Sequence, residues 1–385
     1  MKKLKIIFIL LILLVSLGGY VFFQSNPPEY VYRAVAMSPP TVDDYARFPY
    51  VEIKNSPDTF IFQESSDTSS ELIEEAFNVS NVDIFFESTQ TTSFLVIKND
   101  IILYENYFNG ADKESLLASF SVSKSVLSAL IGIAIQENHI QSVDDPITNY
   151  IPELQSRGFD RVTIKNLLMM SSGVANFNTQ YKVLRLWDAD TRSFYHTDLR
   201  KVALTELYLD TEPGSEFSYN NLNSVLLGLI LERSTNMSVS KYLEEKLWIP
   251  LEMEYPATWN IDSNKNKFEK MALGLNARAI DFTKFGRLFL NNGNWNGEQL
   301  ISEDWISDST QFKESEKNLR AGADSYYKYS WWVYSENEKS DFSAVGLYGQ
   351  FLYISPENNV IIIRTGKEEG LHNWPELFSE LADTI

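Results

Sequence analysis

Cysteine is absent from this chain of 385 residues, and histidine occurs only three times. Without cysteine there is no disulfide, no thiolate nucleophile and no cysteine-ligated metal. The three histidines, His139, His196 and His372, show no metal-ligand spacing, and no Gly-x-Ser-x-Gly motif accompanies them. A serine–histidine triad is therefore not expected, and neither a metal ion nor another cofactor is predicted.

Basic residues are scarce. Lys and Arg number 33 against 52 Asp and Glu, which gives a net charge of −19. A field of this sign disfavours nucleic acids as partners. The hydrophobic fraction of 44% is typical of a globular protein, and the length allows one large domain or two lobes around a sizeable core.

The longest hydrophobic run lies at the N-terminus, where a lysine-rich start precedes the uncharged stretch from Ile6 to Phe23. A helix of that length covers about 27 Å, close to the thickness of the bilayer hydrocarbon. We therefore predict that residues 1–24 are an uncleaved single-pass anchor in the cell membrane, with the bulk of the chain extracytoplasmic. Cleavage after the run, which would release a secreted protein, is the alternative. Residues 25–57 are polar and proline-bearing and are predicted to be a linker.

Beyond residue 57, β-type patterns mark the two ends of the chain. Hairpins are predicted for 93–107, around Asn99-Asp100, and for 351–363, around Pro356 to Asn359. A helix is predicted over 122–136, and its apolar residues cover most of its circumference, which indicates burial on most sides. The sequence thus predicts an α/β (α+β) domain over 58–385. An antiparallel sheet from about 58–140 and 325–385, flanked by helices, would carry a largely helical lobe from about 141–324.

The head of the predicted helix carries a Ser-x-x-Lys motif, Ser121 to Lys124. Residues three apart share one face of a helix, so the hydroxyl and the amine would lie within reach of each other. A serine activated by a lysine base needs that geometry. The motif is not unique, however, because it recurs from Ser238 to Lys241 and from Ser325 to Lys328.

The surroundings distinguish the three serines. Ser238 opens a charged helix, where an N-cap is the simplest role, and Ser325 is predicted to lie in a polar loop. Ser121 alone heads a helix predicted to be buried, where free backbone N–H groups and the helix dipole favour a developing anion. A Tyr-x-Asn sequence, Tyr219 to Asn221, follows at a loop-to-helix junction and offers a partner for the lysine.

This order of motifs resembles the serine β-lactamase and penicillin-binding-protein superfamily, and the detail is most similar to the class C-like branch of β-lactamase-related serine hydrolases that contains 6-aminohexanoate-dimer hydrolase. The resemblance covers about residues 58 to 385. It is carried by Ser119 to Ser125, Tyr150-Ile151-Pro152-Glu153-Leu154, Val162 to Gly173, Pro213-Gly214, Tyr219-Asn220-Asn221, Pro250 to Tyr255, Gly293-Asn294-Trp295-Asn296-Gly297 and Phe342 to Gln350.

The resemblance implies a serine hydrolase that cleaves a small-molecule or peptide-like amide or ester through an acyl-enzyme on Ser121. Lys124 would be the base, Tyr219 the proton relay, and Asn221 would orient the cluster. The backbone N–H groups of Ser121 and Leu347 would bind the oxyanion. Tyr181 resembles a substrate-side residue of this branch.

The chain differs from the superfamily at one motif. The position of its Lys-Thr-Gly triad is occupied by Ala344-Val345-Gly346, which carries no cation to bind a substrate carboxylate. Arg364-Thr365-Gly366 is similar in sequence but ends the wrong strand. A penicillin-binding cell-wall peptidase or esterase is therefore the second hypothesis, and a non-catalytic envelope binding protein is the third.

Overall fold

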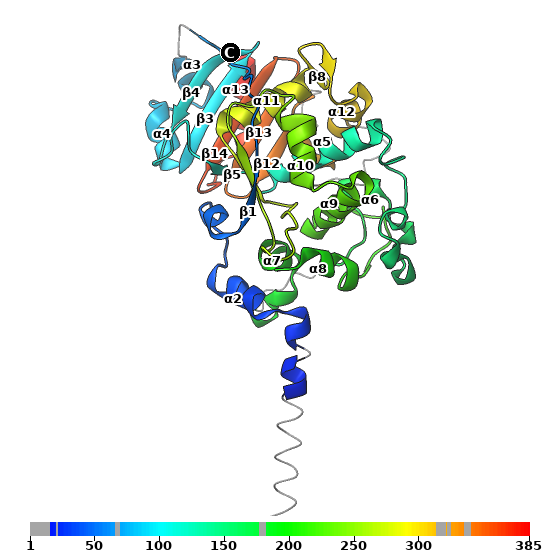
Figure 1. Cartoon of the computed structure of the whole chain (residues 1–385). Helices are drawn as coiled ribbons and strands as arrows, with labels where there is room; N and C mark the ends of the chain where they lie inside the picture. Colours follow the sequence, from blue (N-terminus) through cyan, green and yellow to red (C-terminus); the bar gives the residue numbers. More distant parts are fainter. Residues whose placement is uncertain are drawn as a thin grey trace, which may run out of the picture.

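The computed structural model describes residues 16–20, 22–65, 70–176, 182–312, 321, 325–334 and 340–385. Its largest element is an eight-stranded sheet with the order β10-β11-β12-β13-β14-β3-β4-β2, antiparallel except between β2 and β4 (Figure 1). Its strands are β2 (Gln63–Glu64), β3 (Thr91–Lys98), β4 (Ile101–Tyr107), β10 (Ser325–Lys328), β11 (Trp331–Tyr334), β12 (Phe342–Gly346), β13 (Gln350–Ser355) and β14 (Val360–Gly366).

Two smaller sheets complete the strands that the structure describes, with the orders β1-β6-β7-β5 and β8-β9. They comprise β1 (Tyr50–Ile53), β5 (Leu117–Ala118), β6 (Ala257–Asn260), β7 (Leu275–Ala277), β8 (Asn294–Trp295) and β9 (Glu298–Gln299). The second half of the chain therefore contributes short strands that helical periodicity does not reveal.

The α-helices are α2 (Pro28–Ala36), α3 (Ser70–Ala76), α4 (Val82–Ser88), α5 (Val122–Gln136), α6 (Ile164–Leu168), α7 (Ala189–Tyr195), α8 (Leu199–Thr205), α9 (Asn221–Thr235), α10 (Val239–Leu243), α11 (Ala279–Leu290), α12 (Glu303–Thr310) and α13 (Trp374–Thr384). The short 3₁₀-helices are η1 (Asp44–Arg47), η2 (Ile147–Asn149), η3 (Pro152–Arg157), η4 (Phe159–Arg161) and η5 (Lys182–Trp187), and η6 (Glu244–Trp248) is a short π-helix.

The large sheet is covered by helices on both faces, and its strands show why. Along β3, Leu95 and Ile97 belong to the core formed with α5 and α11, whereas Phe94 and Val96 belong to the core formed with α3, α4 and α13. Successive side chains of a strand point to opposite faces, so a continuous apolar run fills two cores. Gly286 lets α11 approach closely, because a Cβ there would lie 3.0 Å from side-chain carbons of the sheet.

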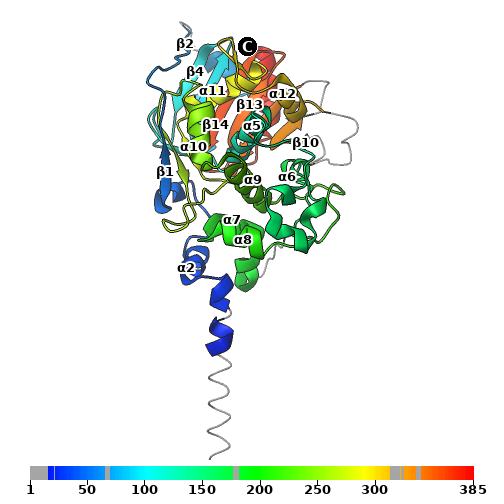
Figure 2. The same ribbon diagram turned by 45° about the vertical axis from the view of Figure 1, so that its right-hand side comes forward.

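Helix α5 connects the sheet to the helical lobe. Every residue from Val122 to Ala134 is buried, as the sequence predicted. One side of α5 contacts β12 and β13, and another side packs against α9, around which α6, α7 and α8 gather (Figure 2). The head of α5 consequently lies where the sheet and the helical lobe meet.

The predicted hairpins are confirmed as β3–β4 and β13–β14. The predicted linker differs from the structure, because residues 25–57 contain α2 and β1. Strand β1 pairs along its length with β6, and α2 packs on α7 through a cluster of Tyr30, Met37, Phe48 and Tyr195. Apolar side chains spaced among polar ones supply this packing, which composition alone does not reveal.

Within the residues that the structure describes, no helix is both long enough and apolar enough to span a bilayer. Much of the predicted anchor, residues 1–15 and 21, lies outside those residues. The anchor remains a prediction.

Candidate active site

Ser121 lies at the N-terminus of α5, and two residues, Ser119 and Phe120, separate it from strand β5. Phe120 has a φ of +46°, a conformation uncommon for a residue with a side chain, and it turns the chain sharply into the helix. Ser121 already has helical φ and ψ, and its side chain makes no capping hydrogen bond. Its hydroxyl is therefore not committed to capping the helix.

Lys124 lies one turn further along α5 and directs its amine at this hydroxyl. Nζ is 2.7 Å from Ser121 Oγ and 2.8 Å from the carbonyl oxygen of Ala272. Only 1% of the Lys124 surface is exposed. Burial lowers the pKa of Lys124 to about 7, and the carboxylate of Asp190 opposes the shift. A large fraction of the amine is therefore neutral near pH 7 and able to accept the serine proton.

Tyr219 completes the cluster from the loop that precedes α9. Its hydroxyl hydrogen-bonds with Ser121, and its ring lies 4.9 Å from Lys124 Nζ. Burial raises the pKa of Tyr219, so the phenol keeps its proton at neutral pH. Asn176 donates to the backbone carbonyl of Tyr219 at 2.7 Å and fixes this loop. A neutral phenol in this position can pass a proton between the amine and a leaving group.

Asn221 follows Tyr219 but contacts a different partner from the one expected. Its Nδ2 donates to Asp190 Oδ1 at 2.8 Å, whereas no hydrogen bond joins it to Ser121 or Lys124. Its Oδ1 is buried and has no hydrogen-bond partner in the described part of the chain. Asn221 therefore holds Asp190, and it acts on the amine through the charge of that carboxylate.

Asp190 was not among the residues predicted for the site. Asp190 lies in the first turn of α7, and its charge raises the pKa values of both Lys124 and Tyr219. No local sequence signal could have revealed this, because the α7–α9 contact joins segments about thirty residues apart.

The two residues of the predicted oxyanion site, Ser121 and Leu347, lie at the head of α5 and just beyond the end of β12. A Cβ on Gly346 would lie 3.2 Å from the backbone nitrogen of Ser121 and 2.3 Å from the carbonyl oxygen of Ser119, so only glycine allows this approach. Leu347 comes next, in the turn that leads to β13. Among described residues, the backbone N–H groups of Ser121 and Leu347 donate to no backbone carbonyl oxygen. Both N–H groups are therefore free to donate to a ligand.

Two buried side chains brace the Leu347 turn from the sheet. Gln350 donates to the carbonyl oxygen of Leu347 at 3.0 Å and to that of Gly366 at 2.7 Å. Arg364 donates to the carbonyl oxygen of Gly349 at 2.7 Å, while its guanidinium lies 3.9 Å from the Trp374 ring centroid on the α13 side of the sheet. Arg364 therefore supports the turn and does not present its charge to the serine, in agreement with the sequence analysis.

Tyr181, the remaining predicted site residue, lies outside the described residues. In the part of the chain that is described, no group of three or more His, Asp or Glu side chains is placed to hold a metal ion.

The family follows from a match over most of the chain. Residues 86–371, which contain Ser121, Lys124, Tyr219 and Leu347, match the family model described as Beta-lactamase. The chain belongs to the beta-lactamase family. It is a serine hydrolase of this family, and a relative that matches 75% of the chain is a hydrolase by name.

Similar proteins agree with this assignment. The chain is 27% identical over 309 residues to 6-aminohexanoate-dimer hydrolase of Paenarthrobacter ureafaciens, which covers 75% of this chain and 74% of the relative. A solved Bacillus anthracis structure, provisionally named a 6-aminohexanoate-dimer hydrolase, has a TM-score of 0.76 at 26% identity and covers 94% of this chain and 93% of its own. A family VIII carboxylesterase shares the fold, with a TM-score of 0.61 at 15% identity over 82% of this chain and 97% of its own.

Proposed function

We propose that this beta-lactamase family member cleaves the amide or ester bond of a small linear substrate through an acyl-enzyme on Ser121. The observation that carries the proposal is the 2.7 Å contact between Lys124 Nζ and Ser121 Oγ, made by an amine that is 99% buried and has a pKa of about 7.

In the first step, neutral Lys124 accepts the proton of Ser121 while Oγ forms a bond to the substrate carbonyl carbon. The backbone N–H groups of Ser121 and Leu347 stabilise the oxyanion. When the intermediate collapses, Tyr219 donates its proton to the leaving amine or alcohol, and the Lys124 ammonium returns a proton to the phenol. Water then releases the acid by the same steps in reverse order, and the enzyme is regenerated.

A linear amide is supported by the name of the 6-aminohexanoate-dimer hydrolase relative, and an ester by the carboxylesterase of the same fold. A penicillin-binding peptidase is the second candidate, but Ala344-Val345-Gly346 places no cation beside the serine for a substrate carboxylate. The predicted N-terminal anchor supports an extracytoplasmic location. A mature N-terminus near Gln24, detected by mass spectrometry, would contradict an uncleaved anchor.

The function is tested by labelling the folded protein with a fluorophosphonate. We expect one adduct on Ser121 in the wild type and in Ser238→Ala, and none in Ser121→Ala. Wild type that folds but takes no label on Ser121 would refute catalysis and favour a binding protein. Turnover of p-nitrophenyl esters, linear amide oligomers, D-amino peptides and a chromogenic cephalosporin then separates esterase, amidase, peptidase and lactamase activities.

A further inference from the structure

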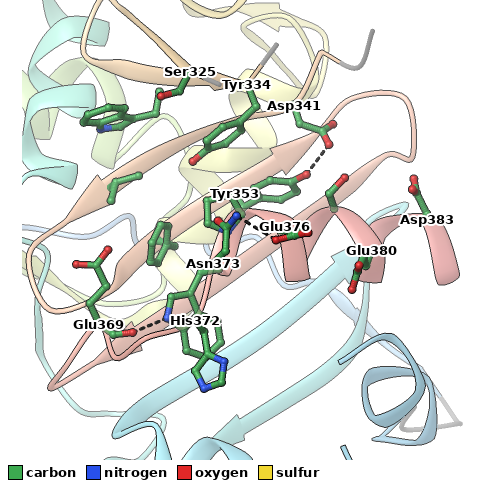
Figure 3. Close-up of a pocket in the computed structure, with 16 residues that line it drawn as sticks. Ser325, Tyr334, Asp341, Tyr353, Glu369, His372, Asn373, Glu376, Glu380 and Asp383 are labelled. Atoms are coloured by element: carbon green, nitrogen blue, oxygen red, sulfur yellow. Dashed lines mark hydrogen bonds between the residues drawn. The ribbon is translucent and has the colours of Figure 1, made fainter. Parts of the chain in front are cut away.

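A cavity of about 620 Å³ lies on the α13 face of the large sheet, opposite the face that α5 covers (Figure 3). Strands β11, β12 and β13 form its floor, and α13 forms one wall. Ser121, Lys124 and Tyr219 are not among its lining residues. The cavity is therefore distinct from the catalytic centre, although the Trp332 ring that lines it also stacks on the Tyr219 ring with centroids 6.4 Å apart.

The lining of this cavity is strongly acidic. Its five carboxylates are Asp341, Glu369, Glu376, Glu380 and Asp383, and none of the described residues that line it is Lys or Arg. Glu376, Glu380 and Asp383 are spaced by four and three residues, so they form a row along one side of α13 (Figure 3). A single-sign cleft with low-dielectric walls concentrates counterions of the opposite charge.

One carboxylate of the cavity, that of Asp341, is buried, and one of its oxygens lacks a hydrogen-bond donor among the described residues. The residue is only 3% exposed, and one carboxylate oxygen accepts a hydrogen bond from the Tyr353 hydroxyl. The other oxygen, Oδ1, is buried and has no hydrogen-bond partner within the described chain. A buried carboxylate oxygen without a donor is costly, and a donor from a bound ligand would remove that cost.

Aromatic rings form the wall beside Asp341. The rings of Tyr334 and Tyr353 stack with centroids 6.2 Å apart, and Trp332 lines the same side. Faces of such rings attract cations and pack against methylene groups. The lining thus combines a buried acceptor, apolar ring faces and a row of carboxylates.

We propose that this cavity binds a linear aliphatic ammonium compound, with one primary ammonium group donating to Asp341 Oδ1 and further ammonium groups facing the carboxylates of α13. A metal ion does not fit, because no three carboxylates in the described chain converge as metal ligands. A quaternary ammonium lacks the N–H that Asp341 requires. The volume of about 620 Å³ and the spread of the acidic row favour an extended chain over a compact cation.

The test measures binding of spermidine to the full-length protein by isothermal titration calorimetry at fixed ionic strength, with tri-lysine peptide and choline as comparison ligands. Spermidine and tri-lysine distinguish a free polyamine from a lysine-bearing peptide as the source of the ammonium groups. We expect saturable binding of at least one of them, and choline should bind on the order of tenfold more weakly because its quaternary nitrogen has no N–H for a charge-assisted hydrogen bond.

Variants distinguish binding in the cavity from nonspecific attraction of cations to the negatively charged protein. Asp341→Asn should weaken binding on the order of tenfold or more, since a buried charge-assisted hydrogen bond is lost. Glu376→Gln with Glu380→Gln alters only the exposed row, and it should weaken binding even if Asp341→Asn fails to fold. Asp160→Asn, an exposed acid elsewhere, is the matched control and should change nothing. Equal affinity for all variants, or no saturable binding of either ligand, would overturn the proposal.

Discussion

The tetrapeptide Ser-Val-Ser-Lys occurs twice in this chain, and its two copies differ in almost every physical respect. At 121–124 the serine has helical backbone angles, its hydroxyl caps nothing, and 1% of the lysine is exposed. At 238–241 the serine is extended with a ψ of 151°, and its hydroxyl accepts a hydrogen bond from the backbone N–H of Lys241. About half of the Lys241 side chain is exposed, and it pairs with Glu244 at 2.7 Å.

The charges of the two lysines differ accordingly. Burial lowers the pKa of Lys124 to about 7, whereas hydrogen bonds to Glu244 and Glu245 raise the pKa of Lys241. The spacing of serine and lysine is therefore not sufficient for a base. Desolvation lets the Lys124 amine be neutral near pH 7, as the proposed base must be, and the backbone angles of Ser121 leave its hydroxyl without a capping role.

The third Ser-x-x-Lys motif cannot bring its hydroxyl and its amine together, for another reason. Ser325 to Lys328 forms β10 and does not lie in the polar loop that its sequence suggested. Residues three apart in a strand point to opposite faces, so the hydroxyl and the amine cannot meet.

The largest effect should come from Ser121→Ala. We expect kcat to fall on the order of 10³-fold or more, because the nucleophile is lost. The unfolding free energy should change by less than about 0.5 kcal/mol, since no capping bond is broken. Ester turnover and thermal unfolding measure both quantities. Ser238→Ala is the matched control with full activity, and loss of turnover in that variant would break the comparison.

Lys124→Met should lower kcat/KM by about 10²- to 10⁴-fold, because the base is removed while most of the buried apolar stem is kept. Its counterpart, Lys241→Met, should retain wild-type kcat/KM. If the two variants lose activity equally, burial of the amine is not what distinguishes the two copies.

A smaller change in activity is expected when the pH is varied for the wild type. Lys124 must be neutral to act, so kcat/KM should fall about tenfold per pH unit below about pH 7 and level off above it. Asp190→Asn removes a carboxylate that raises the pKa of Lys124, so the midpoint should move to lower pH. A midpoint above pH 9 would show that Lys124 is not desolvated in solution.

The smallest effect is expected for the stability of the Ser238→Ala variant. Losing a side-chain N-cap should reduce the unfolding free energy by about 1 kcal/mol in chemical denaturation. Ser121→Ala should show no such loss. Equal losses would mean that Ser121 also caps its helix.

Much of the central architecture follows from local patterns. The apolar residues from Val122 onward predict a buried helix, and the structure has α5 at Val122–Gln136. The turns at Asn99-Asp100 and at 356–359 predict both hairpins, because turn chemistry is local. These signals need no knowledge of distant contacts.

Features that depend on distant contacts were not predictable. The contact between Asn221 and Asp190 and the bracing of the Leu347 turn by Arg364 join separate elements, and no spacing rule describes them. The packing of α2 on α7 was missed for the same reason, since proline-bearing polar sequence resembles a linker whether or not a partner surface exists. Tertiary context decides such cases.

The N-terminal segment has a mechanical consequence. His196 Nε2 lies 3.2 Å from the carbonyl oxygen of Ser25, Arg33 donates to the carbonyl oxygen of Asp262 at 2.7 Å, and the Tyr348 hydroxyl donates to that of Pro40. These hydrogen bonds hold residues 25–40 against the domain. A force applied at the N-terminus would therefore be transmitted to α7 and to the Leu347 turn, whereas a flexible linker would not transmit it.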